Sequence, residues 1–456
     1  MSNSTLALSI ALAGCASAIA SPRLQQIAPK TRPSLDVAKL TEAEVAFARG
    51  RGAAALDELL ARYDRLHEGA ARDAFALRID QVAAQRYATV SRLYWHTNLD
   101  RAKAVAKQQQ KPILSLRMLG RLDEDLSCAN SRFFRATLYA NKDLSAFLRD
   151  NFVLHWSSDR AVPKVTIDFG DGRTIASTTT GNSAHYILDE NGGVLDVIPG
   201  LYAPHAFRAE LATSLAHAKS VAAAPASERG AKRTAYHQAK VAQISAVAEK
   251  LQAHMLFGRR VSAEEALSRA QRATISKGYV EVPQLRQITT AELETIDENE
   301  VATWALFADQ LWPRTKAYGD AVTVNYVEGA VEIVSSAYAP RTIFDAQSLA
   351  LVERLHGDAP AAERTHMLTR LARHALADSA LNQIRLRTEI AAILSDGNSD
   401  FTKVNDVIYA AVFHTPKSDP WLGLRARRDF TGLPNDGASG STAEMTPVAV
   451  PVTARN

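Results

Sequence analysis

Residues 111–138 read KPILSLRMLGRLDEDLSCANSRFFRATL, and their pattern sets the architecture expected in the middle of the chain. A helix capped by Asn98 is expected to end before Lys111-Pro112, because the residue before a proline disfavours helical backbone. Residues 113–118 are then predicted as a buried strand, since they form a short apolar run bounded by turn residues. A Gly-containing loop leads from this strand into a helix that begins near Cys128.

The alternation of short strands and helices continues to residue 217. A strand is expected at 152–156, followed by two hairpins and a closing helix at 204–217. The hairpin turns are Gly170-Asp171-Gly172 and residues 189–193, because both contain the glycine and aspartate that positive φ angles favour. Short strands that alternate with helices are typical of a mixed sheet with flanking helices. We therefore predict an α/β domain over residues 95–217.

The regions on either side of this domain have different patterns. Apolar residues recur at helical spacing in 36–94 and again in 234–413, so both regions are predicted to be mainly helical, with one strand pair expected within 322–336. Residues 21–35 contain three prolines and little periodicity, as a linker would. The Gly, Ser, Thr and Pro residues of 421–456 predict a disordered tail.

Composition excludes several classes of protein. The 456 residues are 46% hydrophobic and 22% charged, which is typical of a soluble globular protein. Lys+Arg total 53 against 49 for Asp+Glu, and the two signs are mixed, so nucleic acid is not expected as a partner. The sequence contains no HExxH, GxSxG, paired CxxC or phosphate-loop motif, and no metal site or cofactor is expected.

The N-terminus indicates export. Leu6–Ala20 reads LALSIALAGCASAIA, an uncharged apolar run of signal-peptide length. Cleavage after the A-x-A motif Ala18-Ile19-Ala20 would give a periplasmic or secreted protein. Alternatively, Leu12-Ala13-Gly14-Cys15 resembles a bacterial lipobox, and acylation of Cys15 would attach the protein to a membrane. Residues 1–10 lack the usual basic residues, which leaves an Ala-rich N-terminal helix as the remaining alternative.

The cysteine content leaves Cys128 as the candidate reactive thiol. The chain has only Cys15 and Cys128, so loss or acylation of Cys15 leaves Cys128 as the single thiol and excludes an internal disulfide. Cys128 lies at an expected helix N-terminus, where unpaired N–H groups and the helix dipole favour a thiolate. We expect its sulfur to be accessible. The alternative is a buried cysteine that acts as a small hydrophobic residue.

At this point the chain resembles the thioredoxin-like superfamily over residues 95–217. The resemblance rests on the Lys111-Pro112 entry to a strand, on Cys128-x-x-Ser131 at a helix start, and on the order helix, strand, loop, helix, strand, hairpin and helix. An additional hairpin is inserted at 162–180. The resemblance implies a thioredoxin-like fold in which Cys128 attacks disulfides.

Two departures from the family pattern affect the implied chemistry. Ser131 occupies the position of the resolving cysteine, so release of a mixed disulfide would need an outside thiol, from a protein or a small molecule. The family's cis-proline has no counterpart, because Gly181, Asn182 and Ser183 stand before the last hairpin. The resemblance nevertheless places these three residues beside Cys128, where they would contact a substrate.

Three functions follow from these residues. The first is a monothiol redox enzyme that uses Cys128, with the Ser131 hydroxyl donating a hydrogen bond to the thiolate. The second is a redox-inactive interaction or scaffold module that keeps only the fold. The third is a cysteine hydrolase in which His185 acts as a base toward Cys128; its alternative is a histidine packed and hydrogen bonded within a sheet.

Overall fold

The computed structural model describes residues 40–179, 181–254, 298–312, 324–327, 330–333, 339–357, 359–422 and 433. Its fold is mixed α/β, in agreement with the class expected from the sequence. A four-stranded sheet has the order β2-β1-β5-β6, with β1 parallel to β2 and β5 antiparallel to both β1 and β6. These strands are β1 Ile113–Leu119, β2 Val153–Arg160, β5 Ser183–Leu188 and β6 Val194–Pro199.

Strands β5 and β6 form because two buried apolar runs flank a turn with the required chemistry. Every residue of both strands is buried. In the turn, Gly192 has a φ of 91°, and the Asp189 carboxylate accepts hydrogen bonds from the N–H groups of Asn191 (2.9 Å) and Gly193 (2.8 Å). The turn predicted at 189–193 is therefore confirmed.

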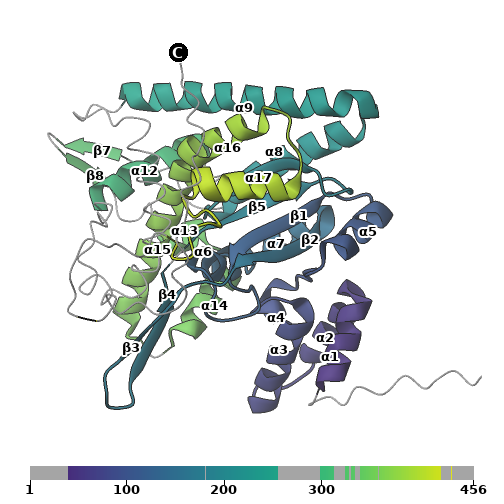
Figure 1. The fold of residues 1–456 in the computed structure, drawn as a ribbon. Helices are drawn as coiled ribbons and strands as arrows, with labels where there is room; N and C mark the ends of the chain where they lie inside the picture. The colour runs from purple at the N-terminus through teal and green to yellow at the C-terminus, as the bar shows by residue number, and fades with distance from the viewer. Residues whose placement is uncertain are drawn as a thin grey trace, which may run out of the picture. The chain divides into compact units, whose positions relative to one another are not determined.

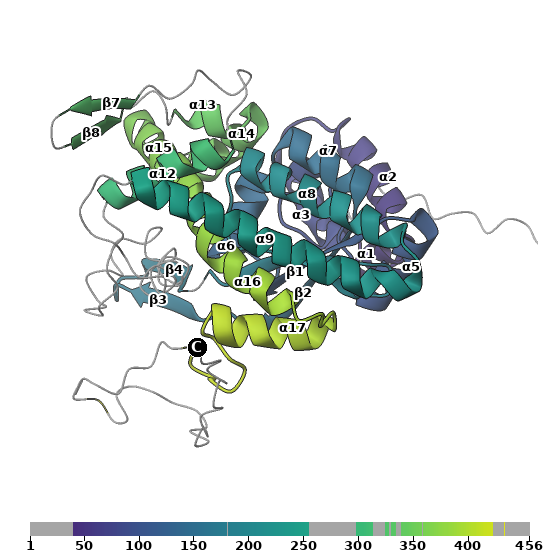
Figure 2. The same ribbon diagram turned by 90° about the horizontal axis from the view of Figure 1, so that it is seen from above.

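Helices flank the sheet. The Asn98 side chain accepts from the Arg101 N–H (2.9 Å) and caps α5, as the sequence predicts. Figure 2 shows α7 and α8 on one side of β1 and β2, and α17 on the other. The bounds of the helices in this region are α5 Leu99–Gln109, α6 Ala129–Phe133, the π-helix η1 Phe134–Leu138, α7 Lys142–Asn151 and α8 Pro204–Ala222.

The first described part of the chain is helical, as expected for residues 36–94. It comprises α1 Glu42–Arg51, α2 Ala53–Tyr63, α3 Ala70–Ala83 and α4 Ala88–Ser91. Two buried indoles connect it to the central region. Trp95 Nε1 donates to Gln85 Oε1 (2.6 Å), and Trp156 Nε1 donates to the Ala84 carbonyl (2.8 Å).

The C-terminal part is also mainly helical, but the sequence did not delimit all of its helices. Those at 401–412 have no separate prediction, and the helix predicted at 263–273 lies outside the described residues. The elements are α9 Ala226–His254, α12 Glu298–Leu311, β7 Val324–Val327, β8 Ala330–Ile333, α13 Pro340–Ile343, α14 Ala346–Leu355, α15 Ala361–Leu381, η4 Asn382–Leu386, α16 Arg387–Leu394, α17 Phe401–Val407 and η5 Ile408–Val412.

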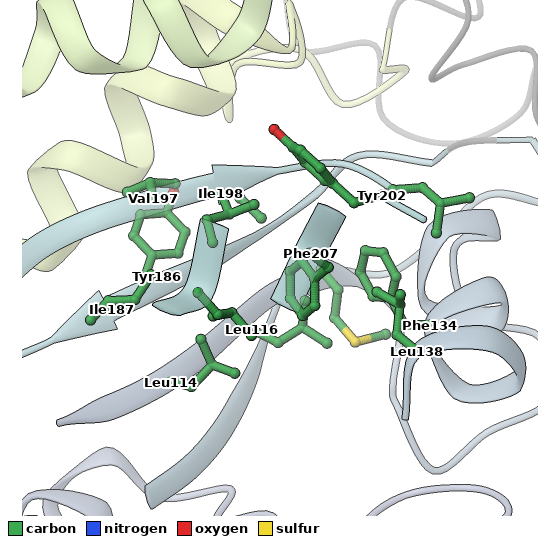
Figure 3. Packing of buried hydrophobic residues seen from close by; sticks show 14 of the residues in the cluster. Leu114, Leu116, Phe134, Leu138, Tyr186, Ile187, Val197, Ile198, Tyr202 and Phe207 are labelled. Carbon is green, nitrogen blue, oxygen red and sulfur yellow. The ribbon is translucent and has the colours of Figure 1, made fainter. Parts of the chain in front are cut away.

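One hydrophobic core includes side chains from the sheet and from both flanking regions. Figure 3 shows Leu116 of β1 among side chains that include Phe134 of η1 and Phe207 of α8. The same cluster of buried residues extends to the C-terminal helices, where the Phe401 ring packs against Tyr186 of β5 at a centroid distance of 5.1 Å. The central sheet and the C-terminal helices are therefore packed together.

The additional hairpin expected at 162–180 forms a sheet of its own. Strands β3 Lys164–Asp168 and β4 Thr174–Thr178 pair antiparallel with one another. In Figures 1 and 2 this hairpin extends away from the four-stranded sheet. The predicted leader at 1–20, the linker at 21–35 and most of the tail at 421–456 lie outside the described residues.

Candidate functional site

The loop between β1 and α6 holds Cys128 as the residue that precedes the helix. Its N–H donates to the Leu119 carbonyl (3.1 Å), which closes the loop against the end of β1. The helix start predicted at this cysteine is therefore present. However, the Cys128 side chain is 0% exposed, so the expectation of an accessible sulfur is wrong.

Two tyrosines from distant parts of the chain belong to the same cluster of buried side chains as Cys128. The Tyr139 hydroxyl is hydrogen bonded to His185, and the Tyr409 hydroxyl donates to the Asn182 carbonyl (3.5 Å). Burial raises the pKa of Tyr139, which follows η1, and that of Tyr409 in η5 well above the ordinary value. Tyr409 and Asn182 are 227 positions apart, so no local sequence pattern could predict that η5 packs in this part of the core.

The Ser131 hydroxyl is directed to partners other than the sulfur. It donates to Ser127 Oγ (2.6 Å) and is 2.8 Å from the Cys128 carbonyl oxygen, and Ser131 is itself 0% exposed. These contacts close the first turn of α6 by side-chain bonding to the backbone. The resemblance implies a hydrogen bond from Ser131 to a Cys128 thiolate. Among the described residues, Ser131 makes no such bond.

The loop before β5 contacts α6, the helix that Cys128 precedes. The Asn130 side-chain amide donates to the Gly181 carbonyl. Asn182 and Ser183 are buried, and Asn182 Nδ2 donates to Thr415 Oγ1 (3.1 Å) from the C-terminal region. The three residues expected to contact a substrate are thus covered by the protein's own chain.

His185 packs within the core rather than pairing with the thiol. Its Nε2 and the Tyr139 hydroxyl are hydrogen bonded at 2.6 Å, and its ring lies 4.7 Å from the rings of Phe134 and Phe207. Burial lowers the pKa of His185 to about 3, so the imidazole is neutral at physiological pH. Among the described residues no hydrogen bond joins His185 to Cys128, and the hydrolase hypothesis gains no support.

Polar groups beside Cys128 anchor the base of the β3–β4 hairpin. Arg132 donates from Nε to the Ser127 carbonyl (3.1 Å) and from Nη2 to Thr178 Oγ1 (2.9 Å). The Thr178 hydroxyl in turn donates to the same Ser127 carbonyl (3.0 Å). The Arg132 side chain therefore connects the loop backbone at Ser127 to strand β4.

A second polar cluster, which the sequence analysis missed, lies at β6. Arg387 of α16 pairs with Asp196 at 2.6 Å, and their side chains are 1% and 2% exposed. Ser214 Oγ (2.6 Å) and the Tyr236 hydroxyl (2.8 Å) also donate to Asp196 Oδ2. Burial alone would raise the pKa of Asp196, but the charges of Arg387, His237 and Lys240 and the hydrogen bond from Arg387 together outweigh it and hold the pKa below its ordinary value.

This cluster connects the sheet to the C-terminal helices through a second buried pair. Lys240 of α9 donates to Glu210 of α8 at 2.9 Å, and the Trp312 indole N–H donates to the other Glu210 oxygen (3.3 Å). Asp196 lies in the apolar run Val194–Ile198. A buried carboxylate needs a charged partner, so an aspartate in this run was a signal in the sequence for an ion pair.

Among the described residues, no group of three or more His, Cys, Asp or Glu side chains could hold a metal ion, and no helix has the length and apolar character needed to cross a membrane. Comparisons with family models, curated proteins and solved structures find no match to this chain.

Proposed function

We propose that the protein is an exported, redox-inactive scaffold of the thioredoxin-like kind. The order of helices and strands from α5 to α8 supports the likeness, since β1 and β2 are parallel neighbours and the β5–β6 hairpin follows beside β1. The observation that carries the redox-inactive part is the complete burial of Cys128. A thiol that attacks a disulfide must be reached by the substrate sulfur and must ionise.

The surroundings of Cys128 support a structural role for this loop. Ser131, Asn130 and Arg132 bond to carbonyls and hydroxyls of neighbouring loops, so each stabilises the backbone. Asn182, in the position expected to face a substrate, is bonded to Thr415 of the same chain. The loops that would serve catalysis instead hold the hairpin and the C-terminal segment in place.

The packing of the C-terminal helices on the sheet supports the proposed scaffold function. Arg117 of β1 donates to Asn405 of α17 (3.3 Å), and the Tyr186 hydroxyl donates to the same amide oxygen (3.1 Å). Together with the Asp196–Arg387 pair, these bonds make the sheet a platform for the C-terminal helices. We therefore propose that the protein binds protein partners through its surface, in the periplasm, at a membrane or outside the cell.

A thiol–disulfide exchange assay with a model disulfide substrate and excess glutathione tests the proposal. We expect wild type and Cys128→Ser to give the same rate as glutathione alone. Cys128→Ala serves as a second variant, because it removes the thiol without adding a hydroxyl to an apolar site. A wild-type rate above this background that both folded variants lose would refute the scaffold function.

Export is tested on the mature protein from its host. Mass spectrometry of the N-terminal peptide is expected to show a start at Ser21 or an acylated Cys15. An N-terminal peptide that retains the intact leader would refute this part of the proposal.

A further inference from the structure

The β3–β4 hairpin has an open edge along β3. Among the described residues, β3 pairs only with β4, in a register that matches Thr166 with Ala176. An isolated two-stranded hairpin is at best marginally stable in water, and a free strand edge is a template for pairing with another strand.

The direction of the free main-chain groups follows from one hydrogen bond. The Phe169 N–H donates to the Arg173 carbonyl (3.1 Å) across the hairpin. Main-chain groups of successive residues alternate between the two sides of a strand, so those of Thr166, Lys164 and Asp168 point away from β4. Three residues of β3 therefore offer their N–H and C=O groups at the outer edge.

The sequence of β3 is complementary to itself. In an antiparallel pair centred on Thr166, Lys164 of one copy lies opposite Asp168 of the other, and Val165 lies opposite Ile167. Opposite charges and β-branched or threonine side chains directly across from each other stabilise antiparallel pairs. A shift by one residue would put the apolar side chains on the wrong face, and a shift by two would leave charges unmatched.

The exposure of the β3 side chains is compatible with this pairing. Lys164, Thr166 and Asp168 are exposed, whereas Val165 and Ile167 are only half-buried on the opposite face. Pairing would join this apolar face to its counterpart in a four-stranded sheet. Phe169, which is 50% exposed at the tip, would come opposite residue 163 of the other copy.

We propose that β3 is a self-association surface, and that its partner is a second copy of this chain related by a two-fold axis through Thr166. Such an interface is isologous, so each copy contributes the same strand and supplies Lys164 to one of the two charged pairs and Asp168 to the other. The charge pattern selects this partner, since an unrelated strand would have to match both ends of β3. This dimer does not depend on the redox state or on the proposed scaffold function.

Charge exchange between two variants tests the proposal on the full chain. Analytical ultracentrifugation over a concentration series is expected to find a dimer for the wild type. Lys164→Glu places two carboxylates opposite each other at both ends, and Asp168→Lys does the same with two ammonium groups. Each should raise the dissociation constant about tenfold or more. An equimolar mixture of the two variants should form a heterodimer, because both charged pairs are then restored.

Proline substitutions on β3 and on β4 test which strand edge forms the dimer. Thr166→Pro removes an outward N–H that the hairpin does not use and is expected to give a monomer, whereas Ala176→Pro makes the same change on β4 and should leave the dimer intact. Circular dichroism confirms the fold of each variant. A monomeric wild type would overturn the proposal. A dimer that tolerates both single charge reversals would also overturn it.

Discussion

Removal of Arg387 should weaken the attachment of α16 to the central sheet. Arg387→Met keeps the aliphatic part of the side chain but leaves Asp196 buried without its cation. Loss of one partner from a buried ion pair costs about 3–5 kcal/mol, because the remaining charge is desolvated and unpaired. The hydroxyls of Ser214 and Tyr236 still donate to Asp196, so we expect a loss near the lower end of this range.

Urea denaturation at pH 7, followed by circular dichroism, measures this loss as a free energy of unfolding. The control is Arg51→Met, which breaks the exposed pair between Arg51 and Glu58 and should change stability little. In the double variant Asp196→Asn with Arg387→Met, no charge of this pair remains buried alone, and part of the loss should be recovered. A loss below about 1 kcal/mol for Arg387→Met would refute the reasoning.

Two further predictions concern the buried His185 and the backbone at two glycines. Because folding lowers the pKa of His185 from 6.5 to about 3, the unfolded chain binds the extra proton between these values and stability falls as the pH drops through this window. In His185→Gln the loss of stability between pH 7.5 and 5, measured by denaturation at each pH, should be about 2 kcal/mol smaller; an unchanged loss would contradict the assignment. Gly200 has a φ of 70°, and an added Cβ would lie 2.6 Å from Asn382 Nδ2, so Gly200→Ala should cost on the order of 1–3 kcal/mol. Gly230→Ala, in open space within α9, should instead stabilise by about 0.5–1 kcal/mol, and equal melting temperatures for these two variants would contradict both.

Local chemistry made the central region predictable from the sequence. The strand predicted at 113–118 is observed at Ile113–Leu119, and both hairpins are observed within one residue of their predicted positions. Proline before β1, the Asn98 cap and glycine turns act on their own neighbours, so their effects can be inferred without knowledge of distant contacts.

The burial of the candidate site could not be predicted in the same way. The sequence places Cys128 at a helix start, but the buried cluster that contains it also includes Tyr409, from a π-helix whose spacing departs from the helical period. The Asn182–Thr415 bond likewise joins residues 233 positions apart. Such contacts depend on tertiary packing, which leaves no local pattern in a single sequence.

The rate of alkylation of Cys128 tests the central claim most directly. Full-length protein is treated with iodoacetamide with and without denaturing urea, and the modified Cys128 peptide is quantified by mass spectrometry, which separates it from any Cys15 product. A thiol with no exposed surface should react in native protein only through unfolding or local opening, so native labelling should be about a thousandfold slower or more. Similar rates in both conditions would show an accessible thiol and contradict the account.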